Sequence, residues 1–283
     1  MSIEAIKNFL DGFSIEVTPR AAAKIDNFAD LIPKGTLIYI AHIEGTPIEE
    51  MVATAKKINE QGFSPMPHFP ARIIKDKNVL QDWISKYQNE ANVKNGLLIA
   101  GGANKPYGEY DSSIQLIESE LFDKANFQNL HIAGHPEGSM DIDPDGSTKN
   151  VDEALSWKNK FKDRSDADMA ITTQFCFDSR TVINWANSIK DKGIDIPIHI
   201  GIAGPAKLQT LLKYSLECGV GASIKILQKR AMNLTKLLLP YKPIPILTEL
   251  AAYKSDHPDF NIEKVHFFPL GGVKQATNFV KEL

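Results

Sequence analysis

Eight short apolar stretches rich in β-branched or aromatic residues recur along this 283-residue chain, and helix-like segments separate most of them. The stretches lie near 13–18, 36–41, 64–69, 96–101, 129–134, 168–176, 197–203 and 264–270. Strands that alternate with helices favour a parallel sheet, and a count of eight favours a closed (β/α)8 barrel. We therefore predict an α/β fold, a (β/α)8 TIM barrel that forms a single domain over residues 1–283. A doubly wound open sheet is the alternative.

The segments between the apolar stretches carry helical patterns. One apolar stripe runs over 48–58 and ends before Gly62, and another precedes Gly193, where glycine suits the residue after a helix. Asp178 is predicted to be the N-cap of that second helix. Residues 222–254 add helical sequence interrupted by three prolines, which predicts extra helices before the last strand.

One connection is unusually long and polar. Residues 140–151 read Met-Asp-Ile-Asp-Pro-Asp-Gly-Ser-Thr-Lys-Asn-Val and contain three aspartates. A loop of this length is predicted to be either functional or mobile.

Composition excludes several classes of partner. The net charge is −3 and 24% of residues are charged, so no basic field is present to attract nucleic acid or anionic lipid. No run approaches the roughly 20 apolar residues of a membrane span, and the N-terminus lacks the apolar core of a signal peptide. Cys176 and Cys218 are too few for a disulfide framework. We expect a cytoplasmic protein with reduced thiols.

Catalytic groups of a barrel lie at the C-terminal ends of its strands. The polar or glycine-rich ends here are Glu16, His42, His68, 101–104, 135–138, Gln174, 201–204 and 271–272. A partly desolvated Glu16 would suit a general acid, although a carboxylate that caps a helix or pairs with lysine fits equally well. Gln174 is predicted to share a strand face with Thr172 and Cys176 and to offer two donors and one acceptor.

The histidines permit a metal hypothesis. His42, His68 and His135 all follow strands, so a metal-dependent lyase or hydrolase is one alternative. No His-x-His motif and no cysteine at ligand spacing accompany them, which favours hydrogen-bonding or core roles and no metal. His199 and His266 lie inside strands and are predicted to be core residues.

Glycines and lysines suggest where an anionic ligand would lie. Gly101, Gly102 and Gly134 would let a flat or phosphorylated ligand approach the backbone, but ordinary turns also need glycine. No Gly-x-Gly-x-x-Gly or Walker motif is present, which excludes a Rossmann site and phosphoryl transfer. Lys158 and Lys160 either meet a pyrophosphate or lie solvated on a helix.

Four segments, in order along the chain, resemble the methylenetetrahydrofolate reductase family of flavin-binding barrels. Residues 171–178, Ile-Thr-Thr-Gln-Phe-Cys-Phe-Asp, resemble its Ile-Thr-Gln-Phe-Phe-Phe-Asp strand, and 133–138, Ala-Gly-His-Pro-Glu-Gly, resemble its Ala-Gly-Tyr-Pro-Glu-Gly. Residues 14–19, Ser-Ile-Glu-Val-Thr-Pro, are similar to its Ser-Phe-Glu-Phe-Phe-Pro, and 193–202 also match. The resemblance covers nearly the whole chain.

This resemblance implies a reaction of one-carbon metabolism. Reduced FAD would pass a hydride to 5,10-methylenetetrahydrofolate and give 5-methyltetrahydrofolate, a step of methionine biosynthesis. Glu16 matches the acid that protonates the folate, and Gln174 matches a glutamine that contacts both pterin and flavin. The resemblance further implies FAD contacts from His68, Gly102, Ala133, His135, Glu153, Lys160 and Gln174.

The chain also departs from the family pattern. Gly101-Gly102-Ala103-Asn104 stands where the family has Arg-Gly-Asp, so Ala103 replaces an aspartate that touches the flavin and folate. The donor (NADH, NADPH or a redox protein), the direction and the oligomeric state, a homo-oligomer included, stay open, and no regulatory domain is expected. A flavin-free barrel that binds folate or a partner protein, without redox activity, is the alternative.

Overall fold

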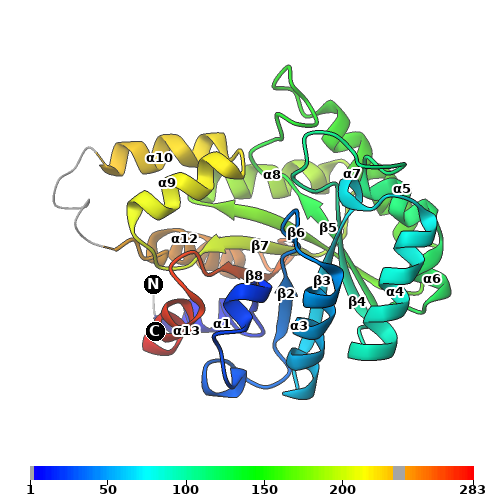
Figure 1. Cartoon of the computed structure of the whole chain (residues 1–283). Coiled ribbons are helices and arrows are strands. Elements are labelled where there is room, and N and C mark those ends of the chain that lie inside the picture. Colours follow the sequence, from blue (N-terminus) through cyan, green and yellow to red (C-terminus); the bar gives the residue numbers. More distant parts are fainter. Residues whose placement is uncertain (1–2, 232–239) are drawn as a thin grey trace. The chain divides into compact units, whose positions relative to one another are not determined.

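Eight strands hydrogen-bond in chain order, β1 to β8, and close into a barrel in the computed structural model (Figure 1). The structure describes residues 3–231 and 240–283. The strands are Ser14–Val17, Leu37–Ile40, Ser64–Pro70, Asn95–Ile99, Asn129–Gly134, Asp168–Cys176, Ile198–Ala203 and Ile262–Phe268. Barrel closure confirms the predicted (β/α)8 fold and excludes the open sheet.

Helices follow most of the strands. The longer ones are α1 (Ile3–Phe9), α3 (Ile48–Glu60), α4 (Lys77–Ala91), α7 (Lys149–Lys162), α8 (Ser179–Asp191), α9 (Leu208–Glu217), α10 (Gly221–Ala231), α12 (Ile244–Asp256) and α13 (Val273–Glu282). The short ones are α2 (Pro19–Ala22), α5 (Ser113–Glu118), α6 (Leu121–Lys124), η1 (Phe28–Asp30) and η2 (Ala71–Ile73). Helices α10 and α12 lie in the segment before β8, which confirms the predicted extra helices; residues 232–239 of that segment lie outside the described residues.

Glycines terminate two helices as their positions predict. Gly62, after α3, has φ +83°, and Gly193, after α8, has φ +78°. Both angles lie in the left-handed region that a side chain disfavours. Asp178 is the N-cap of α8, and its carboxylate accepts a hydrogen bond from the Thr181 hydroxyl at 2.8 Å rather than from a backbone amide.

The chain divides into two compact units. The first comprises residues 14–133 and 160–171, and the second comprises 1–13, 134–159 and 172–283.

In the first unit, aromatic side chains join the strands to the helices outside them. The Phe69 ring lies edge-on to those of Tyr87 and Phe122, with centroids 5.4 and 5.0 Å away. Helices α3 and α4 lie side by side along these strands (Figure 1). On the other face, Tyr39, Met66 and Leu97 form a separate buried cluster inside the barrel.

In the second unit, β6 separates an outer apolar cluster from an inner polar face. Phe175 packs in a buried cluster with Leu211 of α9 and Leu227 of α10. Because side chains alternate along a strand, Gln174 faces the opposite way, toward the barrel interior. The fold thereby places this amide on the face predicted for it.

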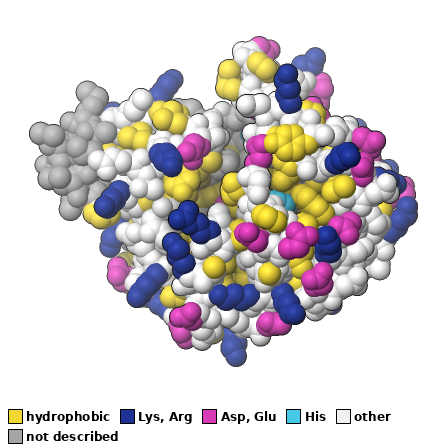
Figure 2. All heavy atoms as spheres, viewed as in Figure 1, with side chains coloured by type: hydrophobic (Ala, Val, Ile, Leu, Met, Phe, Trp, Pro, Cys, Tyr) yellow, Lys and Arg dark blue, Asp and Glu magenta, His cyan; other side chains and the backbone are white. Residues whose placement is uncertain are grey.

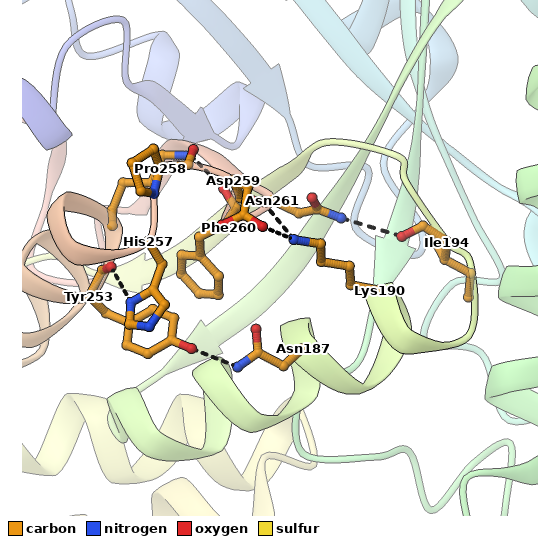
Figure 3. Close-up of polar contacts among 10 residues, drawn as sticks. Asn187, Lys190, Ile194, Tyr253, His257, Pro258, Asp259, Phe260 and Asn261 are labelled. Carbon is orange, nitrogen blue, oxygen red and sulfur yellow. Dashed lines mark hydrogen bonds and ion pairs between the residues drawn. The ribbon is translucent and has the colours of Figure 1, made fainter.

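Polar contacts fasten α8 to the segment around α12 (Figure 3). The Asn187 amide donates to the Tyr253 hydroxyl at 2.8 Å, and Lys190 binds the Asp259 carboxylate. The Tyr253 ring also stacks on His257 with centroids 4.0 Å apart. These contacts hold the start of β8 against α8.

Acidic and basic side chains are interspersed over the described residues of the face in Figure 2. Among the described residues, no helix combines the length and apolar character needed to cross a bilayer.

Candidate functional site

Glu16 and His68 form a pair in the first unit. Oε2 of Glu16 on β1 lies 3.2 Å from Nε2 of His68 on β3, although the two groups are not aligned as in a linear hydrogen bond. The Glu16 side chain is 19% exposed and that of His68 is 10% exposed. Glu16 is therefore partly desolvated, as its position predicts, and an imidazole lies beside it.

Two further aromatic groups border this pair. The Tyr39 ring lies edge-on to His68 with centroids 6.4 Å apart, and the Tyr39 hydroxyl is hydrogen-bonded to Nδ1 of His131. Tyr39 and His131 occupy strand interiors and lack any motif, so the sequence alone does not indicate them. The signal that could have found them is a polar side chain within an otherwise apolar strand, on its inward face.

His42 has a defined local role. It stacks on Trp83 with centroids 4.9 Å apart, and its Nε2 donates to the Thr46 carbonyl at 3.0 Å. Burial lowers the pKa of His42, against the opposing effect of the Thr46 hydrogen bond, and the charge of His68 lowers it further. His42 is therefore a neutral imidazole at neutral pH.

The metal hypothesis finds no geometric support in the part of the chain that the structure describes. No group of three His, Cys, Asp or Glu side chains there is arranged to hold a metal ion. His42 instead binds a backbone carbonyl, and His68 lies beside Glu16.

The turn after β4 contains two glycines. Gly101 has no room for a side chain, whereas Gly102 has free space around it. Gly101 has φ +94°, and a Cβ there would lie 2.8 Å from Cβ of Pro70, so no other residue fits. A Cβ on the exposed Gly102 would meet nothing within 4 Å. Ala103 is buried and its carbonyl accepts from Arg72 at 3.2 Å, whereas Asn104 is exposed. Gly102 is thus the accessible backbone of this turn.

Gln174 on β6 is the notable polar group of the second unit. Its Oε1 atom is buried and has no hydrogen-bond partner among the described residues. Gly201 on β7 is required beside it, because a Cβ there would lie 2.5 Å from the Gln174 carbonyl oxygen. Burial, together with the charges of Glu137 and Asp178, raises the pKa of the Cys176 thiol, which makes it a poor nucleophile.

The loop between β5 and α7 is held in place by carboxylates. Asp143 is buried and accepts hydrogen bonds from the amides of Asn150 and Val151 at 2.9 and 3.1 Å. Glu137 accepts from the backbone amide of Ser223 at 3.0 Å and also from its hydroxyl, near the start of α10. The 140–151 connection is thereby ordered around the first turn of α7.

His135 follows β5, and Lys158 lies on α7. Lys158 is only 7% exposed, and burial lowers its pKa to about 8. Burial and the charge of Lys158 lower the pKa of the half-buried His135 to about 4. Glu153 and Lys160 are exposed on α7. A solvated helix position is therefore wrong for Lys158.

The predicted contacts of the site to folate and flavin stay predictions. Glu16, His68, Gly102 and Ala133 lie in the first unit, and Gln174, His135 and Glu153 lie in the second, with Lys160 at the division within α7.

No family model matches the chain. An uncharacterized protein from Clostridium thermocellum that binds two copies of 5-methyl-5,6,7,8-tetrahydrofolic acid shares the fold, with a TM-score of 0.59. Its sequence is 12% identical, and the match covers 99% of this chain and 97% of that one. A GH10 xylanase from Thermobacillus composti matches with a TM-score of 0.46 and 12% identity, over 94% of this chain and 86% of its own. The first likeness supports the barrel fold, and the second is too weak to support any argument.

Proposed function

We propose that this chain is a flavin-dependent oxidoreductase that interconverts 5,10-methylenetetrahydrofolate and 5-methyltetrahydrofolate. The observation that carries the proposal is the buried Oε1 of Gln174, which has no partner among the described residues. An unsatisfied buried acceptor costs roughly 1–3 kcal/mol, and a ligand N–H would remove that cost. A pterin and a flavin both present such N–H groups on a flat ring.

The proton step of the proposed reaction belongs to Glu16. Opening the five-membered ring of the substrate requires a proton on a folate nitrogen, and a partly desolvated carboxyl is suited to donate it. Nε2 of His68 lies 3.2 Å from Oε2 of Glu16, so the imidazole borders the carboxyl that would donate the proton.

FAD, when bound, would supply the hydride chemistry. Gln174 would offer its amide to the ring system. His135, neutral at neutral pH, would offer one hydrogen-bond donor and one acceptor. These residue types fit a flavin.

A separate observation supports a folate as the ligand. The Clostridium thermocellum protein with the same fold binds 5-methyltetrahydrofolate, although its 12% identity establishes only the fold. A folate-binding barrel without flavin is the second candidate. The buried methyl group of Ala103 favours it, because no carboxylate is available there to act on a flavin.

Reconstitution with FAD tests the proposal. The purified protein should bind FAD, turn yellow, and lose its flavin absorbance when mixed without oxygen with NADH, NADPH or 5-methyltetrahydrofolate. Glu16→Gln should still bind FAD and accept electrons from the nicotinamide, but should reduce methylenetetrahydrofolate at least about a hundredfold more slowly, since general acid catalysis contributes 10²–10⁴-fold. The exposed Glu44→Gln is the matched control.

A colourless protein that binds 5-methyltetrahydrofolate but not FAD would establish the flavin-free candidate instead. Full turnover by Glu16→Gln would remove Glu16 from the acid role.

A further inference from the structure

A buried hydrogen bond lies inside the barrel, on the strands of the first unit. The Tyr39 hydroxyl and Nδ1 of His131 form it, and these residues are 0% and 3% exposed. Tyr39 packs in one cluster with the apolar side chains of Met66 and Leu97, which offer it no strong acceptor. Burial of a hydroxyl and an imidazole is costly, and the bond between them offsets that cost.

Strand register places Tyr39 beside Glu16. The two residues are partners in the parallel pairing of β1 with β2, so their side chains lie on the same face of the sheet. On β3, the His68 ring lies edge-on to Tyr39 with centroids 6.4 Å apart, and Nε2 of His68 lies 3.2 Å from Oε2 of Glu16. Tyr39 therefore borders both members of this acid–imidazole pair.

The direction of the Tyr39 hydroxyl decides how this residue affects Glu16. A hydroxyl that donates to a carboxylate stabilises the charged form and lowers the pKa of the acid, whereas an aromatic ring beside it favours the protonated form by desolvation. Tyrosine has one O–H proton to donate, and His131 accepts it when the imidazole carries its own proton on Nε2. A proton donated to His131 is not available to Glu16.

We propose that His131 is a positioning residue for Glu16: it holds the Tyr39 hydroxyl in a hydrogen bond and so keeps that donor away from the carboxylate. The inference rests on the acid role in the proposed function, because a proton donor works best when its carboxyl stays protonated toward neutral pH. Two further titratable groups face this region from the first unit: His68, beside Glu16, and His42, whose Nε2 binds a backbone carbonyl. Variants of Tyr39 and His131 leave both in place.

Carbon NMR of the Glu16 carboxyl measures its pKa directly in the protein without ligands, and Glu16→Gln identifies the resonance. His131→Leu removes the acceptor, so the released hydroxyl should donate to the carboxylate and lower the pKa of Glu16 by about one unit, or about tenfold in its ionisation. His131→Asn places an amide oxygen where Nδ1 lies and should keep the wild-type pKa, because the hydroxyl stays engaged.

Tyr39→Phe tests whether His131 acts through the hydroxyl. The ring stays and the donor is lost, so the pKa of Glu16 should remain that of the wild type. The double variant Tyr39→Phe/His131→Leu should match Tyr39→Phe, because no hydroxyl remains to be released. Met66→Leu alters the packing of the same cluster without touching a polar group, and as the control it should leave the pKa of Glu16 unchanged.

Three results would overturn the inference. An unchanged pKa of Glu16 in His131→Leu would show that the released hydroxyl does not reach the carboxylate, and an equal fall in the double variant would show that His131 does not act through Tyr39. Nitrogen NMR of the wild type that finds the proton of neutral His131 on Nδ1 would contradict its role as the acceptor. This last measurement needs no variant, so it decides the matter even if His131→Leu does not fold.

Turnover separates this inference from the proposed function. The reduction of methylenetetrahydrofolate should slow as the pH rises through the pKa of Glu16, and in His131→Leu that fall should occur about one unit lower while the rate at low pH is kept. If the pKa of Glu16 responds as expected but Glu16→Gln retains full turnover, the effect of His131 on Glu16 stands and the acid role of Glu16 is wrong.

Discussion

The buried ammonium of Lys158 also affects stability. Its pKa in the folded protein is about 8, against 10.5 for a solvated lysine. The folded state therefore binds this proton less tightly than the unfolded state does. The group destabilises the fold fully below pH 8, and the penalty disappears as the pH rises from 8 toward 10.5.

Lys158→Met should therefore make the protein more stable at neutral pH. The expected gain is about 3 kcal/mol at pH 7, an upper figure set by the pKa shift, and it should shrink to nothing near pH 10.5. Urea unfolding at several pH values measures it, with Lys149→Met as the control. A variant less stable than the wild type at pH 7 would show that Lys158 has a favourable partner.

At the scale of elements, buried carboxylates position the loop before α7. The two amides that Asp143 binds are among those left free at a helix N-terminus, so this side chain satisfies them from outside the helix. Asp145, in the same loop, is exposed and accepts a hydrogen bond from the nearby amide of Ser147 at 2.9 Å. Asp143 therefore ties this part of the loop to the first turn of α7.

Asp143→Ala should destabilise the protein by about 1–3 kcal/mol, because it leaves buried amides without acceptors. Asp145→Ala should change stability by less than about 0.5 kcal/mol. Thermal or urea unfolding distinguishes the two variants, and equal effects would show that Asp143 has no special role in ordering the loop.

At the scale of the whole molecule, the closed barrel requires close approach of neighbouring strands. Gly201 donates its amide to Oγ1 of Thr173 at 2.9 Å, and β6 lies so near that a methyl group would meet backbone oxygens at 2.5 Å. Those oxygens belong to the strand that carries Gln174. A side chain at position 201 would therefore disturb both the barrel and the candidate ligand site.

Gly201→Ala should cost at least about 1–3 kcal/mol, the usual penalty for overpacking, and should weaken ligand binding by moving β6. Gly102→Ala, where a Cβ meets nothing, is the control for stability. Unfolding free energies of both variants check this, and equal values would contradict the close approach.

The fold could be predicted because it rests on periodic signals. Apolar runs located all eight strands to within a few residues, and glycines marked the ends of α3 and α8.

The candidate site was only partly predictable from the sequence. Strand ends indicated Glu16 and Gln174, but the partner of Glu16 comes from a strand about 50 residues away, and Tyr39 and His131 lie 92 residues apart. The burial of Lys158 rather than Lys160 depends on the rotation of α7, which a one-dimensional pattern does not define.

The contacts between α8 and the segment before β8 have a consequence for local opening. Asn187 and Lys190 on α8 hold Tyr253 and Asp259, so neither α8 nor the end of α12 can separate without breaking the polar contacts of the other. These elements should form one cooperative foldon whose amides exchange with solvent together. A shared hydrogen-exchange rate in α8 and the end of α12 would show that the two elements open as one.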